Sequence, residues 1–190
     1  MIGTENASFD VLFAKPLKMK SGENSQLGLF TRNRVEFPSF NNEQNSPFFL
    51  SLNILSYNLK WSGNLNPVLQ AQVDNFGFTL KTGLQWLHIA EKHFFLIIAT
   101  YDIYTQPLID NFLVYRWFPQ VSNRLVGFLQ FEMVNLVPIN TGVNILKQRL
   151  KLGRKKGDWQ YGFGLDHNWI GVTKLQSSFN PGLFVRYEFL

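Results

Sequence analysis

The 190-residue chain contains no cysteine and few charged residues, with Asp, Glu, Lys and Arg together making up 16% of it. The absence of cysteine excludes a disulfide framework and any thiolate metal site. Ordinary soluble proteins carry roughly 25% charged residues, so there is little charge here to cover a water-exposed surface. Aromatic residues also reach 16%, and 19 of them are Phe.

Long hydrophobic runs are missing as well. The longest purely apolar stretch covers residues 94–99, whereas a transmembrane helix needs roughly 20 apolar residues. The mean hydropathy is −0.07, and no segment of ten or more residues has a convincing helical pattern. Many aromatics with few charges and no long apolar run are typical of a transmembrane β-barrel, because lipid-facing and lumen-facing residues average out along each strand.

Residues 1–6 lack the basic segment followed by an apolar segment that marks a secretory signal peptide. We therefore expect either a protein that is not exported or a mature or engineered form of an exported one, and we favour the second. The net charge of +5 raises the question of nucleic-acid binding. The clearest basic cluster, residues 147–156, spans an alternating strand and a turn and matches no nucleic-acid motif, so we expect no nucleic-acid partner.

Strict alternation of large apolar and small polar residues is what the sequence does contain. In residues 75–90 one side carries Phe76, Phe78, Leu80, Leu84 and Trp86. In residues 158–171 one side carries Trp159, Tyr161, Phe163, Leu165 and Trp169. The opposite sides consist mainly of Gly, Asn, Gln, Thr, Lys and Asp. A period of two indicates a β-strand, and this contrast between the faces is expected where one faces lipid and the other a wet interior.

Similar alternation over most of the chain predicts one domain, residues 1–190, folded as an up-and-down antiparallel transmembrane β-barrel. Treating residues 68–90 as one strand gives ten strands, and splitting them near Asp74 gives eleven. Bacterial single-chain barrels have an even number, so we expect ten, with eight or twelve as alternatives. In residues 48–61 the apolar positions change from Leu50, Leu52 and Ile54 to Leu55 and Tyr57, which predicts a β-bulge.

In the last segment, residues 180–190, Leu183, Val185, Tyr187 and Phe189 alternate with Phe184, Arg186 and Glu188. This segment resembles the C-terminal strand of Gram-negative outer-membrane β-barrels, which carries a glycine, alternating hydrophobic residues and a terminal aromatic. The residues that match are Gly182, Val185, Tyr187 and Phe189, and Leu190 after the last aromatic is a departure from the pattern. The resemblance implies an outer-membrane location and recognition of this strand by the barrel-assembly machinery.

The alternation also assigns the charged and aromatic residues to faces. The charged residues predicted to face the lumen are Arg32, Arg34, Glu36, Lys81, Asp102, Arg116, Glu132, Lys147, Arg149, Lys151, Asp166, Arg186 and Glu188. The residues predicted to face lipid or to form interfacial girdles are Phe76, Phe78, Trp86, Tyr101, Trp117, Trp159, Phe163 and Trp169. Charges in a narrow lumen must pair or hydrate, so we expect either an interior plugged by salt bridges or a narrow, anion-preferring pore.

Strand ends and turns follow from the same pattern. We expect the turns at residues 91–92, 119–123 and 154–157 on one side of the barrel. Loops 106–110, 137–140 and 175–181 are expected on the other side.

The three histidines, His88, His93 and His167, have no metal-ligand spacing, so we expect no metal site and no cofactor. Asp166 and His167 point to opposite faces of a regular strand, although Ser177 and Ser178 lie close enough in sequence to approach His167. The leading expectation is a non-enzymatic outer-membrane barrel, either a structural accessory subunit or a narrow channel, with membrane lipid and other outer-membrane proteins as partners. A soluble lipocalin-like barrel for an apolar ligand and a barrel enzyme acting on lipid remain as alternatives.

Overall fold

The computed structural model describes residues 1–18, 22, 24–38, 46–59, 61–104, 107–122, 125–172 and 176–187. These residues form β-strands joined by turns. They contain no helix that is long and apolar enough to cross a membrane. The strands are β1 (Ile2–Gly3), β2 (Asn6–Lys18), β3 (Asn24–Pro38), β4 (Phe48–Tyr57), β5 (Leu65–Asp74), β6 (Gly77–Ile89), β7 (His93–Asp102), β8 (Leu108–Trp117), β9 (Gln120–Ser122), β10 (Leu125–Pro138), β11 (Asn144–Lys156), β12 (Trp159–Gly171) and β13 (Gln176–Tyr187).

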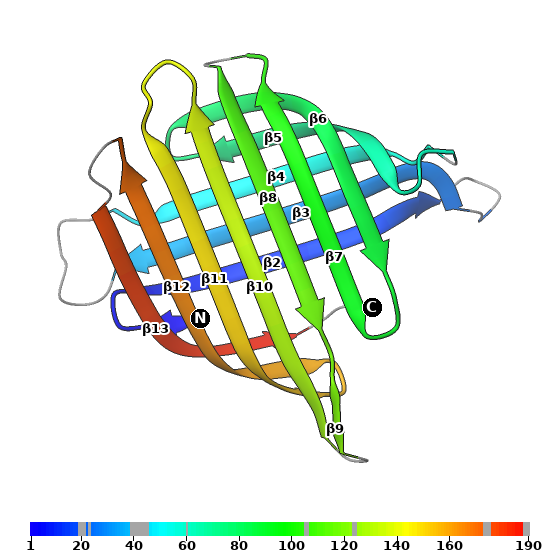
Figure 1. Cartoon of the computed structure of the whole chain (residues 1–190), viewed down its shortest axis with the longest axis vertical. Helices are drawn as coiled ribbons and strands as arrows, with labels where there is room; N and C mark the ends of the chain where they lie inside the picture. The colour runs from blue at the N-terminus through cyan, green and yellow to red at the C-terminus, as the bar shows by residue number, and fades with distance from the viewer. Residues whose placement is uncertain are drawn as a thin grey trace.

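All the strands belong to one antiparallel sheet that closes on itself, because β10 pairs with both β8 and β11 (Figure 1). The short β9 pairs with β10 beyond the end of β8, so the two share one place in the wall and the barrel has twelve strands. The predicted antiparallel barrel is thus confirmed. The preferred count of ten is wrong, and the alternative of twelve is correct.

The predicted number of strands was too low first because residues 68–90 were taken as one strand, whereas the chain turns at Asn75 and Phe76 from β5 into β6. The backbone amide of Phe76 donates to Oδ1 of Asp74 at 2.8 Å, and Gly77 has a φ of +123° that favours glycine. Phe76 sits at the tip of this turn, 91% exposed. Because Phe76 keeps the alternation with Phe78 across the turn, sequence periodicity alone does not reveal the break.

The other missed strand is β1, which lies between the first and the last long strand. Ile2 pairs antiparallel with Leu183 of β13 and with Ala7 of β2. β1 and β13 approach closely at Gly182, because a Cβ there would overlap the carbonyl of Ile2. The two-residue β1 therefore closes an antiparallel barrel in which β2 and β13 run in the same direction.

The interior is only partly polar. Eight buried apolar side chains from β3 to β8 form a cluster inside the barrel: Phe30, Leu52, Ile54, Val68, Leu96, Ile98, Phe112 and Val114. The predicted bulge in residues 48–61 is wrong, since β4 pairs with β3 and β5 without any register shift. Leu52 and Ile54 face inward, whereas Leu55 and Tyr57 face outward, so both faces of β4 are apolar.

The connections divide between two ends of the barrel as predicted. Those after β6, β8 and β11 lie at the end where β13 finishes, which we call the C-terminal end. Those after β7, β10 and β12 lie at the opposite, N-terminal end. The bounds differ in detail: Asp110 belongs to β8 rather than to a loop, and β11 continues to Lys156, so the turn is formed by Gly157 and Asp158. Residues 176–181, predicted as loop, belong to β13, and residues 120–122, predicted as turn, form β9.

Candidate functional site: the charged interior

Three arginines and four carboxylates form a continuous network of ion pairs inside the barrel. Arg32 and Arg34 of β3 both contact Asp10 of β2, at 2.5 and 3.3 Å. Arg34 also contacts Glu36 at 2.5 Å and reaches Asp166 of β12 at 3.4 Å. The strands place these groups on one face because Asp10, Arg32, Arg34 and Glu36 alternate with residues that face outward.

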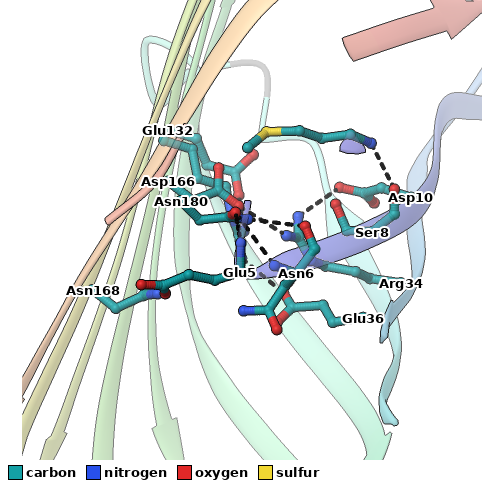
Figure 2. A network of polar contacts seen from close by, with 12 residues as sticks. Glu5, Asn6, Ser8, Asp10, Arg34, Glu36, Glu132, Asp166, Asn168 and Asn180 are labelled. Atoms are coloured by element: carbon teal, nitrogen blue, oxygen red, sulfur yellow. Dashed lines mark hydrogen bonds and ion pairs between the residues drawn. The ribbon is translucent and has the colours of Figure 1, made fainter. Parts of the chain in front are cut away.

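Glu132 and Arg149 connect this cluster to β10 and β11. Glu132, which is only 2% exposed, accepts from Arg32 at 2.9 Å and from Arg149 at 2.5 Å. Arg149 also contacts Glu36 at 3.2 Å and Asp166 at 3.5 Å. Figure 2 shows Arg34 and Glu36 of β3 lying close to Glu132 of β10 and Asp166 of β12 inside the barrel. Buried charges are tolerated only when paired in this way, because desolvation of a lone charge costs several kcal/mol.

The network leaves almost no free space. The cavity beside it has a volume of about 10 Å³, close to the space for a single water molecule. Its lining is polar: Asn6, Ser8, Arg34, Glu36, Arg149, Asp166, Asn168 and Asn180. At this level the side chains themselves close the interior.

Two smaller polar clusters extend the network. Nζ of Lys81 lies 2.7 Å from Asp110 and 3.4 Å from Gln72. Gln130 accepts from Nε of Arg116 and from Nη1 of Arg186, both at 2.9 Å, and its own amide donates to Glu132 at 3.5 Å. Two lysine side chains lie over aromatic rings. Nζ of Lys147 is 5.4 Å from the ring centroid of Phe48, and Nζ of Lys151 is 5.6 Å from that of Phe184.

The structure places the predicted interior charges as follows. Those that are buried are Arg32, Arg34, Lys81, Asp102, Arg116, Glu132, Arg149 and Asp166. Those that are partly buried are Glu36, Lys147, Lys151 and Arg186. Glu188 lies outside the described residues.

The residues predicted to face lipid lie on the outer wall, except Phe76, which lies at the tip of the turn between β5 and β6. Those that are exposed are Phe76, Phe78, Tyr101, Trp117, Trp159 and Phe163, and those that are partly exposed are Trp86 and Trp169. Within the predicted insertion signal, Val185 and Tyr187 are exposed and Gly182 lies against β1. Phe189 lies outside the described residues.

Sequence reasoning missed Asp10 and Asp110. Asp10 sits on the polar side of an alternating strand, between Phe9 and Val11, and that signal was available. Asp110 was assigned to a loop because Pro107 suggested a turn, yet it faces Lys81 from within β8. With these two carboxylates, the net positive charge of the interior is smaller than the sequence predicted.

The histidines lie on the outer wall or at its edge. The ring of His167 stacks on Phe179 at 3.9 Å, and its Nδ1 accepts from Trp169 at 3.0 Å, while Asp166 faces inward. Nδ1 of His93 lies 2.9 Å from the hydroxyl of Tyr115. Within the described ranges, no three His, Asp or Glu residues are grouped so that they could hold a metal ion. No protein-family model, curated protein or solved structure matches the chain.

Proposed function

We propose that this chain is a small, non-enzymatic outer-membrane β-barrel with a closed interior, and that it serves as a structural or accessory subunit of an envelope assembly. The observation that carries the proposal is the inverted distribution of polarity. Lys81 is 1% exposed and Glu132 is 2% exposed, whereas Phe163 on the outer wall is 73% exposed. A wall of this kind fits an apolar solvent, because soluble exteriors carry about 25–35% charged residues and expose few large apolar side chains.

Aromatic residues at the two ends of the outer wall support the same assignment. At the C-terminal end they lie at or near the strand ends: Trp86, Trp117, Trp159 and Tyr187. At the N-terminal end they include Phe78, Tyr101 and Trp169. Tyr and Trp favour membrane interfaces because one part of each side chain is apolar and the other polar.

The state of the interior favours a structural role over a channel. The ion pairs of Glu132 link β3 to β10 and β11, and the adjacent cavity measures about 10 Å³. The narrow, anion-preferring channel is less well supported, because Asp10 and Asp110 offset much of the expected positive charge. A soluble lipocalin-like barrel would place Phe78 inside and Lys81 in water, opposite to what is observed.

A polar patch on the outer wall supports contact with another membrane protein. Thr31 and Asn33 of β3 lie opposite Asn53 and Ser51 of β4, in the middle of both strands. The hydroxyl of Thr31 donates to Oδ1 of Asn53 at 3.0 Å, and the side chains of Asn33 and Asn53 are exposed. Amides facing lipid lack hydrogen-bond partners that a neighbouring protein supplies. The exposed alternating residues of β13 fit recognition by the barrel-assembly machinery.

Three measurements on the same preparation test this proposal. The protein is expected to stay in the membrane after carbonate washing, to change its gel mobility on boiling, and to show no conductance or only a small, anion-preferring one in planar bilayers. A protein that folds as a monomer without detergent or lipid would overturn the membrane assignment. A large, cation-selective conductance would instead contradict the closed interior.

Single cysteines at the two ends of the barrel test its sidedness. Because the chain has no native cysteine, Ser122→Cys at the C-terminal end and Thr141→Cys at the N-terminal end each introduce a unique thiol at an exposed position. With the C-terminal end in the periplasm, an impermeant maleimide should label Thr141→Cys on intact cells and label Ser122→Cys only after permeabilisation. Equal labelling of both on intact cells would contradict this orientation.

A further inference from the structure

A second cavity, separate from the charged network, lies inside the barrel towards its C-terminal end. Its volume is about 250 Å³. The side chains that give it its apolar character are Ala14, Pro16, Phe30, Leu87, Phe94 and Leu96. They come from β2 and β3 on one side and from β6 and β7 on the other. An apolar cavity of about 150 Å³ already binds benzene in preference to water, so this one is large enough for a hydrocarbon ligand.

The cavity is open to the outside beside β2. Lys15 and Leu29 pair with each other on the outer face of β2 and β3, yet both border the cavity. Beyond Ser8, the only described strand that pairs with β2 is β3, because β1 reaches no further than Ala7 and Ser8. Ala14 and Pro16 are consequently exposed although they face inward. An elongated ligand can therefore enter beside this part of β2.

Polar groups also border the cavity. Lys15 supplies a cation, and Ser56, Asn58 and Gln85 supply neutral hydrogen-bonding groups. Among the residues that the structure describes, no acidic side chain lines the cavity. An anionic group is therefore attracted by Lys15 without an opposing charge from this described lining. We infer that the cavity binds a fatty acid, with its hydrocarbon chain between Phe30, Leu87 and Phe94 and its carboxylate at Lys15.

The inference goes beyond the proposed function and does not depend on it, since the same cavity would bind a fatty acid in a soluble barrel. The probe is decanoic acid with a diazirine near the end of its chain, added to folded protein in an amphipol and activated by light. Adducts are expected on Phe30, Leu87, Phe94 or Leu96. Among fatty acids of increasing chain length whose chains remain fully buried, the affinity for the protein should rise about fourfold for each added methylene.

Two variants and a matched control make the test specific. Ala14→Trp fills the cavity from the exposed part of β2 and should reduce labelling of the cavity residues at least tenfold. Ala99→Trp adds the same ring on the outer wall and should leave the labelling unchanged. Lys15→Glu should weaken binding of the acid several-fold and leave binding of the corresponding decanol probe unchanged. A circular dichroism spectrum like that of the wild type confirms that each variant is folded.

The outcomes separate the fatty acid from lipid that merely surrounds the barrel. Adducts confined to outward residues such as Leu84, Ile97 and Phe163 would overturn the inference. Equal effects of Lys15→Glu on the acid and the alcohol would overturn the carboxylate site at Lys15. Loss of labelling in Ala14→Trp together with a cytosolic, carbonate-soluble protein would support the cavity while contradicting the membrane assignment.

Discussion

Replacing Glu132 with glutamine is expected to lower the free energy of unfolding by about 3–5 kcal/mol. The glutamine keeps the shape of the side chain but removes the negative charge that Arg32 and Arg149 share at 2.9 and 2.5 Å. Two buried guanidinium groups would then face each other with less compensation. This cost is large because neither arginine can reach bulk water from its position inside the barrel.

Urea unfolding in lipid vesicles, followed by tryptophan fluorescence, measures this effect. Glu91→Gln is the matched control, because Glu91 is exposed in the turn after β6 and its replacement should change stability by less than about 0.5 kcal/mol. The double variant Glu132→Gln/Arg149→Gln should lose less stability than the sum of the two single variants. Equal, small losses for Glu132→Gln and Glu91→Gln would show that the network does not stabilise the closed interior.

Replacing Phe163 with arginine is expected to cost about 2–4 kcal/mol in a bilayer. Phe163 lies near the middle of β12 and is 73% exposed on the outer wall. A guanidinium at this height has no water to hydrate it in a membrane. In a soluble barrel the same side chain would reach water, and the change would fall within about 0.5 kcal/mol.

The comparison of two positions separates these cases. Phe76 lies at the tip of the turn between β5 and β6. An arginine there can reach water at the membrane surface, so Phe76→Arg is expected to cause little loss of stability. Phe163→Leu keeps an apolar side chain and controls for the loss of the ring. If Phe163→Arg and Phe76→Arg unfold at the same urea concentration in vesicles, the lipid-facing assignment of β12 is wrong.

Much of the barrel could be predicted because alternation assigns residues to faces without knowledge of their partners. Residues such as Lys81, Arg149 and Asp166 fell on the polar side of their strands, and the structure buries all three. The same logic failed for β4, where Leu52 and Ile54 face an apolar part of the interior and Leu55 faces outward. Two apolar faces give no alternation, so the pattern was mistaken for a bulge.

The sequence by itself determined that the chain is all-β and which side of most strands is polar, because a strand's side chains alternate with a period of two. Only the tertiary structure decided how many strands close the barrel and which charges meet. Arg32 and Glu132 are 100 residues apart along the chain and pair because β3 and β10 both face the same interior. The cavity beside Lys15 likewise depends on where β1 stops along β2. Such contacts depend on register and closure between distant strands, which local periodicity does not specify.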